Sequence, residues 1–309
     1  MIPSRCTAAL ALDFFVPGGP QSRQELQCEF FAYPGLLFPA DQQWGAMSEA
    51  AANEAIWREL LTGEGSGFAR HRRRNRRVPG RPRCKTCLIP PSGPISRVLR
   101  MINDLAPSAM NPNYCNQCER FVHTHPGGAE IELTLLFADI RGSTRLAEQK
   151  TTSEFRQLLN RFYEAANRVV IDSDGLVDKL VGDEVIGLYL PVSGPDHARR
   201  AILAARVLLL ATGHRDADGP WVPVGAGVHT GTAYVGAVGS QAVSDFTALG
   251  DAVNVTARLS SVAAAGDVLI SESSYPTVRD ELGELELRHL DVKGHDARID
   301  VRVLRLASM

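Results

Sequence analysis

Two isolated aspartates in the second half of the chain could bind metal ions. Asp139 ends the apolar stretch LTLLFADIRGST and leads into a turn of small polar residues, and Asp183 lies between two apolar stretches in GLVDKLVGDEVIGLYLP. Mg²⁺ binds few protein carboxylates and takes its other oxygen ligands from phosphate and water. Two such ions could activate an attacking oxygen and neutralise phosphates held by the turn after Asp139. The alternative is that Asp139 caps a helix and Asp183 fills a turn.

Alternating strands and helices are predicted around these aspartates. Apolar runs, helical periodicity and turn residues predict a strand at 131–140, a helix at 153–171, a hairpin around Gly182 and Asp183, a helix at 196–212, a second hairpin at 222–238, a helix at 251–263, and strands near Val268, Leu285 and Val301. The order β-α-β-β-α-β with additions predicts an α+β, ferredoxin-like fold, with helices on one face of an antiparallel-containing sheet. In this topology the first strand and first hairpin are neighbours, so Asp139 and Asp183 would converge.

Five motifs in a fixed order give this part of the chain a family resemblance. They are FADIRGST, DKLVGDE, VGAGVHTGTAYVGAVGS, FTALGDAVNVTAR and DVKG. Together they resemble the catalytic domain of class III nucleotidyl cyclases over about residues 131–305. The resemblance implies a head-to-tail homodimer in which two chains share each active site, with two Mg²⁺ or Mn²⁺ ions per site.

The resemblance also implies the residues that hold metal and phosphate. Asp139 and Asp183 correspond to the two metal-binding aspartates, and Ile140 would add its backbone carbonyl. The turn that follows would receive the triphosphate, through Gly142, Ser143 and Thr144.

Three further positions match residues that act on the ribose and the phosphates. Asn254 corresponds to the asparagine that orients the ribose, and Arg258 to the arginine that stabilises the pentavalent phosphorus. They are four residues apart, so they share one face of a helix. Lys293 corresponds to the lysine that contacts the terminal phosphates. Such charges suit a reaction in which the ribose 3′ oxygen attacks the α-phosphorus in line.

The positions that match the purine-contacting residues favour ATP as the substrate. Lys179 can donate to N1 of adenine, and the hydroxyl of Thr247 can accept from the 6-amino group. A guanylate cyclase, which is the alternative, would more typically carry Glu in place of Lys179. Thr247 stands where the commonest pattern has Asp, and it resembles a threonine-bearing subgroup (class IIIb-like), which implies regulation by bicarbonate. We therefore expect an adenylate cyclase that makes 3′,5′-cyclic AMP and diphosphate for intracellular signalling.

All six cysteines lie before residue 120, and four of them form two C-x-x-C pairs. The four are Cys84, Cys87, Cys115 and Cys118. In a cytosolic chain this spacing predicts a structural Zn²⁺ site, with an iron–sulfur cluster or a redox-responsive dithiol as alternatives. We expect Cys6 and Cys28 to be free thiols.

Composition divides the chain into four segments. Residues 1–46 are expected to be a disordered extension, and Met47 could be the true start. Residues 47–83 are expected to form a short helix and a flexible arginine-rich linker, and residues 84–128 a four-cysteine module containing a helix at 95–105. Residues 129–309 are expected to form the cyclase domain.

The charge distribution leaves a second function open. The net charge is −2, but eight arginines lie within residues 70–83. With zinc, this basic run would also fit a nucleic-acid-binding regulator that carries a degenerate cyclase domain. The set of catalytic residues is intact at every position except the threonine at 247, which argues against that alternative. No apolar run approaches the length of a membrane span, so we expect a cytoplasmic protein.

Overall fold

The computed structural model describes most of the chain from residue 49 onward. The described residues are 49–63, 66–84, 86–93, 96–98, 101, 104–108, 114–125, 127–239, 244–290 and 298–306, and all belong to one compact unit, Phe38–Met309. The predicted extension at 1–46, the start at Met47, the thiols of Cys6 and Cys28, and Lys293 lie outside the described residues. No helix in the described ranges is both long enough and apolar enough to cross a bilayer.

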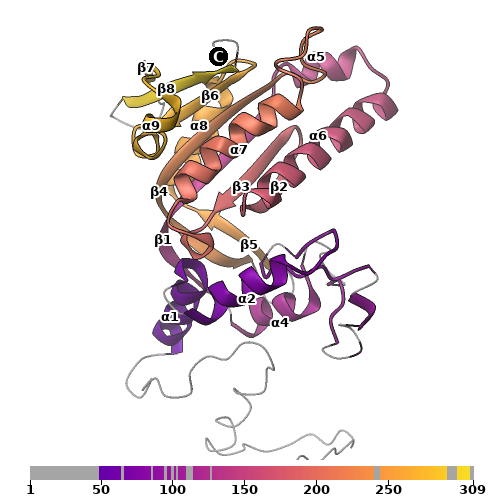
Figure 1. Ribbon diagram of the computed structural model, residues 1–309, viewed down its shortest axis with the longest axis vertical. Coiled ribbons are helices and arrows are strands. Elements are labelled where there is room, and N and C mark those ends of the chain that lie inside the picture. The colour runs from indigo at the N-terminus through magenta and orange to yellow at the C-terminus, as the bar shows by residue number, and fades with distance from the viewer. Residues whose placement is uncertain are drawn as a thin grey trace, which may run out of the picture. The chain divides into compact units, whose positions relative to one another are not determined.

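Eight strands form one sheet (Figure 1). They are β1 Gly128–Ile140, β2 Leu176–Val181, β3 Glu184–Tyr189, β4 Val224–Gly239, β5 Ser244–Leu249, β6 Asp267–Ser271, β7 Glu286–Leu290 and β8 Ile299–Arg305. The strand order is β2-β3-β1-β4-β6-β8-β7, and β5 pairs with β4 outside this path. β4 and β6 are parallel, and the other pairs are antiparallel. The first four strands and their helices confirm the predicted α+β, ferredoxin-like fold with added strands.

The helices agree closely with the predicted periodicity. Their bounds are α1 Glu49–Thr62, α2 Ser66–Arg76, α4 Asn116–Thr124, α5 Ser143–Glu148, α6 Thr152–Asp172, α7 His197–Ala211, α8 Asp251–Val262 and α9 Arg279–Leu282. The three helices predicted after residue 150 match α6, α7 and α8 to within one residue at each end. In the segment predicted to be helical at 95–105, residues 96–98 and 101 are helical, and 104–105 are not.

Helices cover both faces of the sheet, whereas the sequence predicted one covered face. Successive residues of a strand point to opposite faces, so β6 distinguishes the two sides. Val268 and Ile270 join the core that contains α6 and α7. Leu269 packs instead with Val255 and Leu259 of α8. The added helix α8 therefore lies across the sheet from α6 and α7.

The predicted hairpin at 222–238 is wrong. This segment forms the single long strand β4, and its hairpin partner is β5. The glycines in β4 that indicated a turn allow α8 to approach the strand instead. A Cβ atom at Gly227 would lie 2.5 Å from the backbone nitrogen of Ser260 and 2.7 Å from Cβ of Leu259. Sequence periodicity does not distinguish a turn glycine from one that admits a neighbouring helix.

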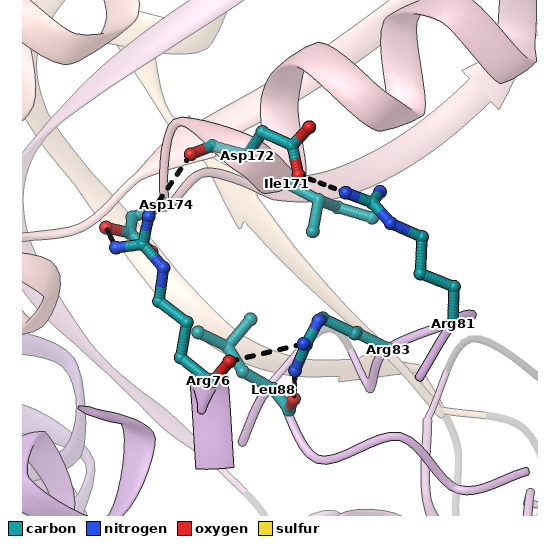
Figure 2. Close-up of a pocket in the computed structure, with 7 residues that line it drawn as sticks. All are labelled: Arg76, Arg81, Arg83, Leu88, Ile171, Asp172 and Asp174. Carbon is teal, nitrogen blue, oxygen red and sulfur yellow. Dashed lines mark hydrogen bonds and ion pairs between the residues drawn. The ribbon is translucent and has the colours of Figure 1, made fainter. Parts of the chain in front are cut away.

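The arginine-rich segment is not a free linker. Its first part forms α2, in which Arg72 is only 4% exposed and donates to the carbonyl of Thr86 at 2.7 Å. Arg76 pairs with Asp174 at 2.6 Å, and Arg81 pairs with Asp172 at the end of α6 (Figure 2). The expectation of a flexible linker failed because these arginines have specific acceptors on both sides.

Replacing Gly227 with alanine should destabilise the fold, because the new methyl group meets backbone atoms of α8 that cannot move independently. We expect a loss of about 1–3 kcal/mol in the free energy of unfolding, measured by urea denaturation. Gly187→Ala in β3 is the control, because its Cβ would meet only side-chain atoms at ordinary contact distance, the Val170 methyl groups at 3.4 Å and Cε2 of Tyr189 at 3.5 Å. Equal losses in the two variants would contradict this account of β4.

Candidate active site

The pairing of β1 with β3 brings the two predicted metal ligands to one edge of the sheet. Asp139 stands opposite Glu184 in the antiparallel register, directly after the turn that contains Asp183. The backbone nitrogen of Ile140 donates to the carbonyl of Asp183 at 3.1 Å, which closes this end of the strands. The hydroxyl of Tyr163 on α6 donates to the carbonyl of Gly182 and holds the turn from the other side.

A third acid, Glu184, lies in this group and was missed by sequence reasoning. Burial raises the pKa of Asp139 to about 6, with Arg141 opposing the shift and the charge of Asp183 adding to it. Burial and the charges of Asp139 and Asp183 raise the pKa of Glu184 to about 7. The sequence signal for Glu184 was its position directly after Asp183 in GDE. We call Asp139, Asp183 and Glu184 the carboxylate cluster.

The carboxylate cluster fits a divalent cation. Oδ1 of Asp139 is buried and has no hydrogen-bond partner among the described residues, while Oδ2 contacts Arg141. A buried carboxylate oxygen without a donor is unfavourable unless a cation or proton reaches it. A bound cation would also offset the burial and the neighbouring negative charges that raise the pKa values of Asp139 and Glu184. Hard cations such as Mg²⁺ and Mn²⁺ suit these oxygen ligands.

The turn beyond the carboxylate cluster is open on its outer side. Gly142 has φ +68°, a left-handed conformation, and a Cβ there would meet nothing within 4 Å. Gly142 and Thr144 are exposed, and Ser143 is half-buried. The three residues predicted to receive the triphosphate therefore lie beside the predicted metal ligands.

The predicted purine-contacting residues meet at a second place, between β2 and β5. The hydroxyl of Thr247 donates to Oδ2 of Asp178 at 2.9 Å, and both residues are buried. Nζ of Lys179 lies 3.9 Å from Oδ2 of Asp245. Sequence reasoning missed both acids, although Asp178 directly precedes Lys179 in DKL. We call Asp178, Lys179, Asp245 and Thr247 the base-contact cluster.

The strand register relates the two clusters through β5 and through β2. Thr247 stands opposite Gly236, which stands opposite Gly128 at the start of β1, eleven residues before Asp139. On the β2 side, however, Lys179 stands opposite Ile186, which stands opposite Phe137, only two residues before Asp139. Among the described residues, no hydrogen bond or ion pair links the two clusters.

The two predicted catalytic residues lie on α8. Asn254 is exposed and Arg258 is half-buried, with Nε buried and without a hydrogen-bond partner among the described residues. Arg141 donates to the carbonyl of Ser261 at 2.8 Å, which ties the end of α8 to the turn after β1. No described hydrogen bond or ion pair joins the side chains of Asn254 or Arg258 to either cluster.

The four C-x-x-C cysteines converge. Their sulfur atoms all lie within 4.8 Å of one another, and no disulfide joins them. Cys84, Cys87 and Cys115 are at most 5% exposed. We call Cys84, Cys87, Cys115 and Cys118 the four-cysteine cluster.

Comparison with known proteins identifies the family. The sequence model of the adenylate and guanylate cyclase catalytic domain matches residues 129–302. The chain belongs to this family. Its cyclase domain is 30% identical to an adenylate cyclase of Anabaena cylindrica over 179 residues, which is 55% of this chain and 36% of that protein. It is 34% identical to an adenylate cyclase of Mycobacterium bovis over 170 residues, which is 53% of this chain and 37% of that protein.

The structural comparison agrees with the family assignment. The guanylyl cyclase Cya2 superimposes on the cyclase domain with a TM-score of 0.53 at 26% identity, covering 57% of this chain and 93% of that one. The chain spans little more than a third of the length of the two adenylate cyclases.

Replacing Glu184 with glutamine should change stability in a pH-dependent way. The folded protein raises the pKa of Glu184 from 4.5 to about 7, so folding disfavours its charged form, and the destabilisation grows as pH rises through this window. With a chelator present, the Glu184→Gln variant should melt roughly 2–4 °C above the wild type at pH values above about 7. The difference should vanish near pH 4.5, where Glu184 is protonated in the folded protein. Thermal melts monitored by circular dichroism would measure it. A pH-independent difference would contradict the raised pKa of Glu184.

Proposed function

We propose that the protein is an adenylate cyclase, which converts ATP to 3′,5′-cyclic AMP and diphosphate. The observation that carries this proposal is the hydrogen bond from Thr247 to Asp178. In this hydrogen bond the single hydroxyl proton of Thr247 is committed to Asp178. The hydroxyl oxygen then offers only lone pairs to a bound base.

An acceptor at Thr247 and a donor at Lys179 together select adenine. Adenine presents a donor, its 6-amino group, beside an acceptor, N1. Guanine presents the reverse pair, a carbonyl oxygen beside a protonated N1. Leaving polar groups unpaired in such a pocket disfavours the wrong base strongly. Because Cya2 is a guanylyl cyclase, GTP is the necessary comparison substrate.

The chain's own residues would position the reacting atoms. Asn254 would orient the ribose so that its 3′ oxygen faces the α-phosphorus, and Arg258 would stabilise the charge that develops there. Gly142, Ser143, Thr144 and Lys293 would hold the phosphates. Asp139, Asp183 and the carbonyl of Ile140 would hold Mg²⁺ or Mn²⁺, which lowers the pKa of the attacking hydroxyl and neutralises the leaving diphosphate.

The active unit would be a homodimer with two shared sites. The membership of the chain in the cyclase family supports this assembly, because the family resemblance implies sites shared between two chains. Each site would take its carboxylates from one chain, and its base-contact residues, Asn254 and Arg258 from the other. Regulation by bicarbonate stays a prediction from the threonine at 247, as do the domain boundaries at 84–128 and 129–309.

The nucleic-acid alternative receives no support from the arginine-rich segment. Arg72 is buried, and Arg76, Arg81 and Arg83 bind acids or backbone carbonyls of this chain. Those guanidinium groups are engaged within the fold, so we do not propose a nucleic-acid partner.

Mixing two inactive variants should restore activity. Asp139→Ala and Arg258→Ala homodimers should each lose at least about 100-fold in kcat, whereas the hybrid keeps one complete site. Random exchange makes half of the dimers hybrid, so the mixture should reach about a quarter of the wild-type rate. Cyclic AMP formation would measure it. Mixing Asp139→Ala with Asp183→Ala is the control that should stay inactive, and an inactive first mixture would refute the shared sites.

Replacing Asp178 with asparagine should weaken the choice of base. The amide of asparagine can donate to Thr247 and release its hydroxyl proton toward the carbonyl of guanine. We expect the ratio of kcat/KM for ATP to that for GTP to fall by roughly tenfold or more, as a misdirected hydrogen bond predicts. Thr247→Ser, which keeps the hydroxyl, should preserve the ratio better than Thr247→Val. An unchanged ratio in Asp178→Asn would contradict the proposal.

A further inference from the structure

We infer that the four-cysteine cluster binds one Zn²⁺ ion, and that this ion positions β2 and β5, the two strands that carry the base-contact cluster. The inference of a zinc site does not depend on the proposed cyclase function. The inferred effect of zinc on ATP binding does depend on that function.

The sulfur positions fit one tetrahedral ion. A Zn–S bond of about 2.3 Å in tetrahedral geometry places sulfur atoms about 3.8 Å apart. The sulfur atoms of Cys87 and Cys115, which come from different C-x-x-C pairs, are 3.7 Å apart. Iron–sulfur clusters spread four cysteines over two or more irons, so some sulfur pairs would exceed the 4.8 Å limit seen here. A dithiol switch would need two close pairs rather than four sulfurs around one point.

The backbone around the cluster also supports metal-bound thiolates. The backbone nitrogen of Cys115 donates to Sγ of Cys84 at 3.3 Å, a hydrogen bond that stabilises negative charge on sulfur. The nitrogen of Leu88 donates to the carbonyl of Cys84 at 3.1 Å, and Leu88 has φ +63°. This left-handed residue after the second cysteine wraps the chain around the first pair. A bulky residue adopts such a conformation only when its surroundings enforce it.

The first cysteine pair is linked to β2 through the arginine-rich helix. Asn75 of α2 donates to the carbonyl of Cys87 at 2.9 Å, and Arg83 donates to the carbonyl of Leu88 at 2.8 Å. One turn away from Asn75, Arg72 donates to Thr86. From the same helix, Arg76 binds Asp174, two residues before β2 begins (Figure 2). The first pair is therefore connected, through α2, to the segment that leads into Asp178 and Lys179.

The second cysteine pair is linked to β5 through aromatic contacts. Cys115 precedes α4, and Cys118 lies within it. Phe121 of α4 packs edge-on against Trp57 of α1, with ring centroids 5.4 Å apart. Trp57 stacks on Phe246 of β5 at 6.0 Å, beside Thr247 in the sequence. The second pair is therefore connected, through Phe121 and Trp57, to the strand that carries Thr247.

One ion shared by both pairs would join these two routes. The hydrogen bond between Thr247 and Asp178 spans β5 and β2, so its geometry depends on how these strands are held. Losing the ion would free the two halves of the module to move separately. The acceptor and donor for adenine would then lose their fixed spacing, which affects binding more than the chemical step.

Metal analysis of the full chain tests the site. We expect one zinc per chain by mass spectrometry, loss of zinc in Cys118→Ser, and retention in Cys118→His, because histidine is also a zinc ligand. Cys28→Ser, which removes a cysteine from neither C-x-x-C pair, is the matched control and should keep its zinc. Absence of zinc from the wild type, or iron with visible absorption in its place, would overturn the assignment.

Two variants test the coupling while keeping all four cysteines. Arg76→Ala and Trp57→Ala each cut one route, so both should retain zinc and raise the KM for ATP by roughly tenfold, with a smaller change in kcat. Arg73→Ala, an exposed arginine of the same helix, should change neither, and Trp57→Phe should restore most of the affinity. Zinc-bearing variants with an unchanged KM would overturn the coupling.

Hydrogen exchange separates this inference from the proposed function. Removing zinc with a chelator should speed amide exchange in β2 and β5 and leave β7 unchanged, whether or not the protein turns over ATP. Faster exchange with no cyclase activity in the zinc-loaded wild type would refute the proposed function alone. Unchanged exchange in β2 and β5 in an active enzyme would refute the positioning role of zinc alone.

Discussion

The antiparallel register of β1 and β3 determines where the charged groups of the carboxylate cluster lie. It sets Asp139 opposite Glu184 and next to the turn that holds Asp183. A shift of one residue would turn Asp139 to the other face of the sheet, because side chains alternate along a strand. The apolar side chains on both faces of β1 are buried, and this packing prevents such a shift. The packing therefore holds the three acids close together although their negative charges repel one another. The packing of the fold thereby keeps the acids of the carboxylate cluster in an arrangement that favours cation binding.

Topology and periodicity predicted the fold and the convergence of Asp139 with Asp183, because both depend on apolar spacing and strand order. Interactions between side chains distant in sequence were not predictable in the same way. Glu184 and Asp178 each adjoin a predicted site residue, but only the three-dimensional pairing shows that they face the same group. The arginine-rich segment was misjudged for a similar reason. Its composition indicates solvation, whereas acceptors up to 98 residues away in sequence bind it within the fold.

The roles of α2 illustrate how charged residues support packing in a region with few apolar side chains. Arg72 is buried and donates a hydrogen bond to the carbonyl of Thr86. This gives the carbonyl oxygen a partner inside the protein. A guanidinium has several donors in a fixed plane, so arginine suits such contacts better than lysine. The same helix reaches Asp174 with its next turn, and one short element thus contacts both the four-cysteine cluster and the approach to β2.

The proposed sharing of each site between two chains has a consequence for the behaviour of the protein in a cell. On that proposal, a single chain carries every component that the reaction needs, yet cannot use them on one substrate molecule. Where most chains are monomeric, the number of complete sites grows with the square of the chain concentration. Doubling expression would then raise nucleotide production about fourfold, and a pool of dilute chains would remain silent without any inhibitor.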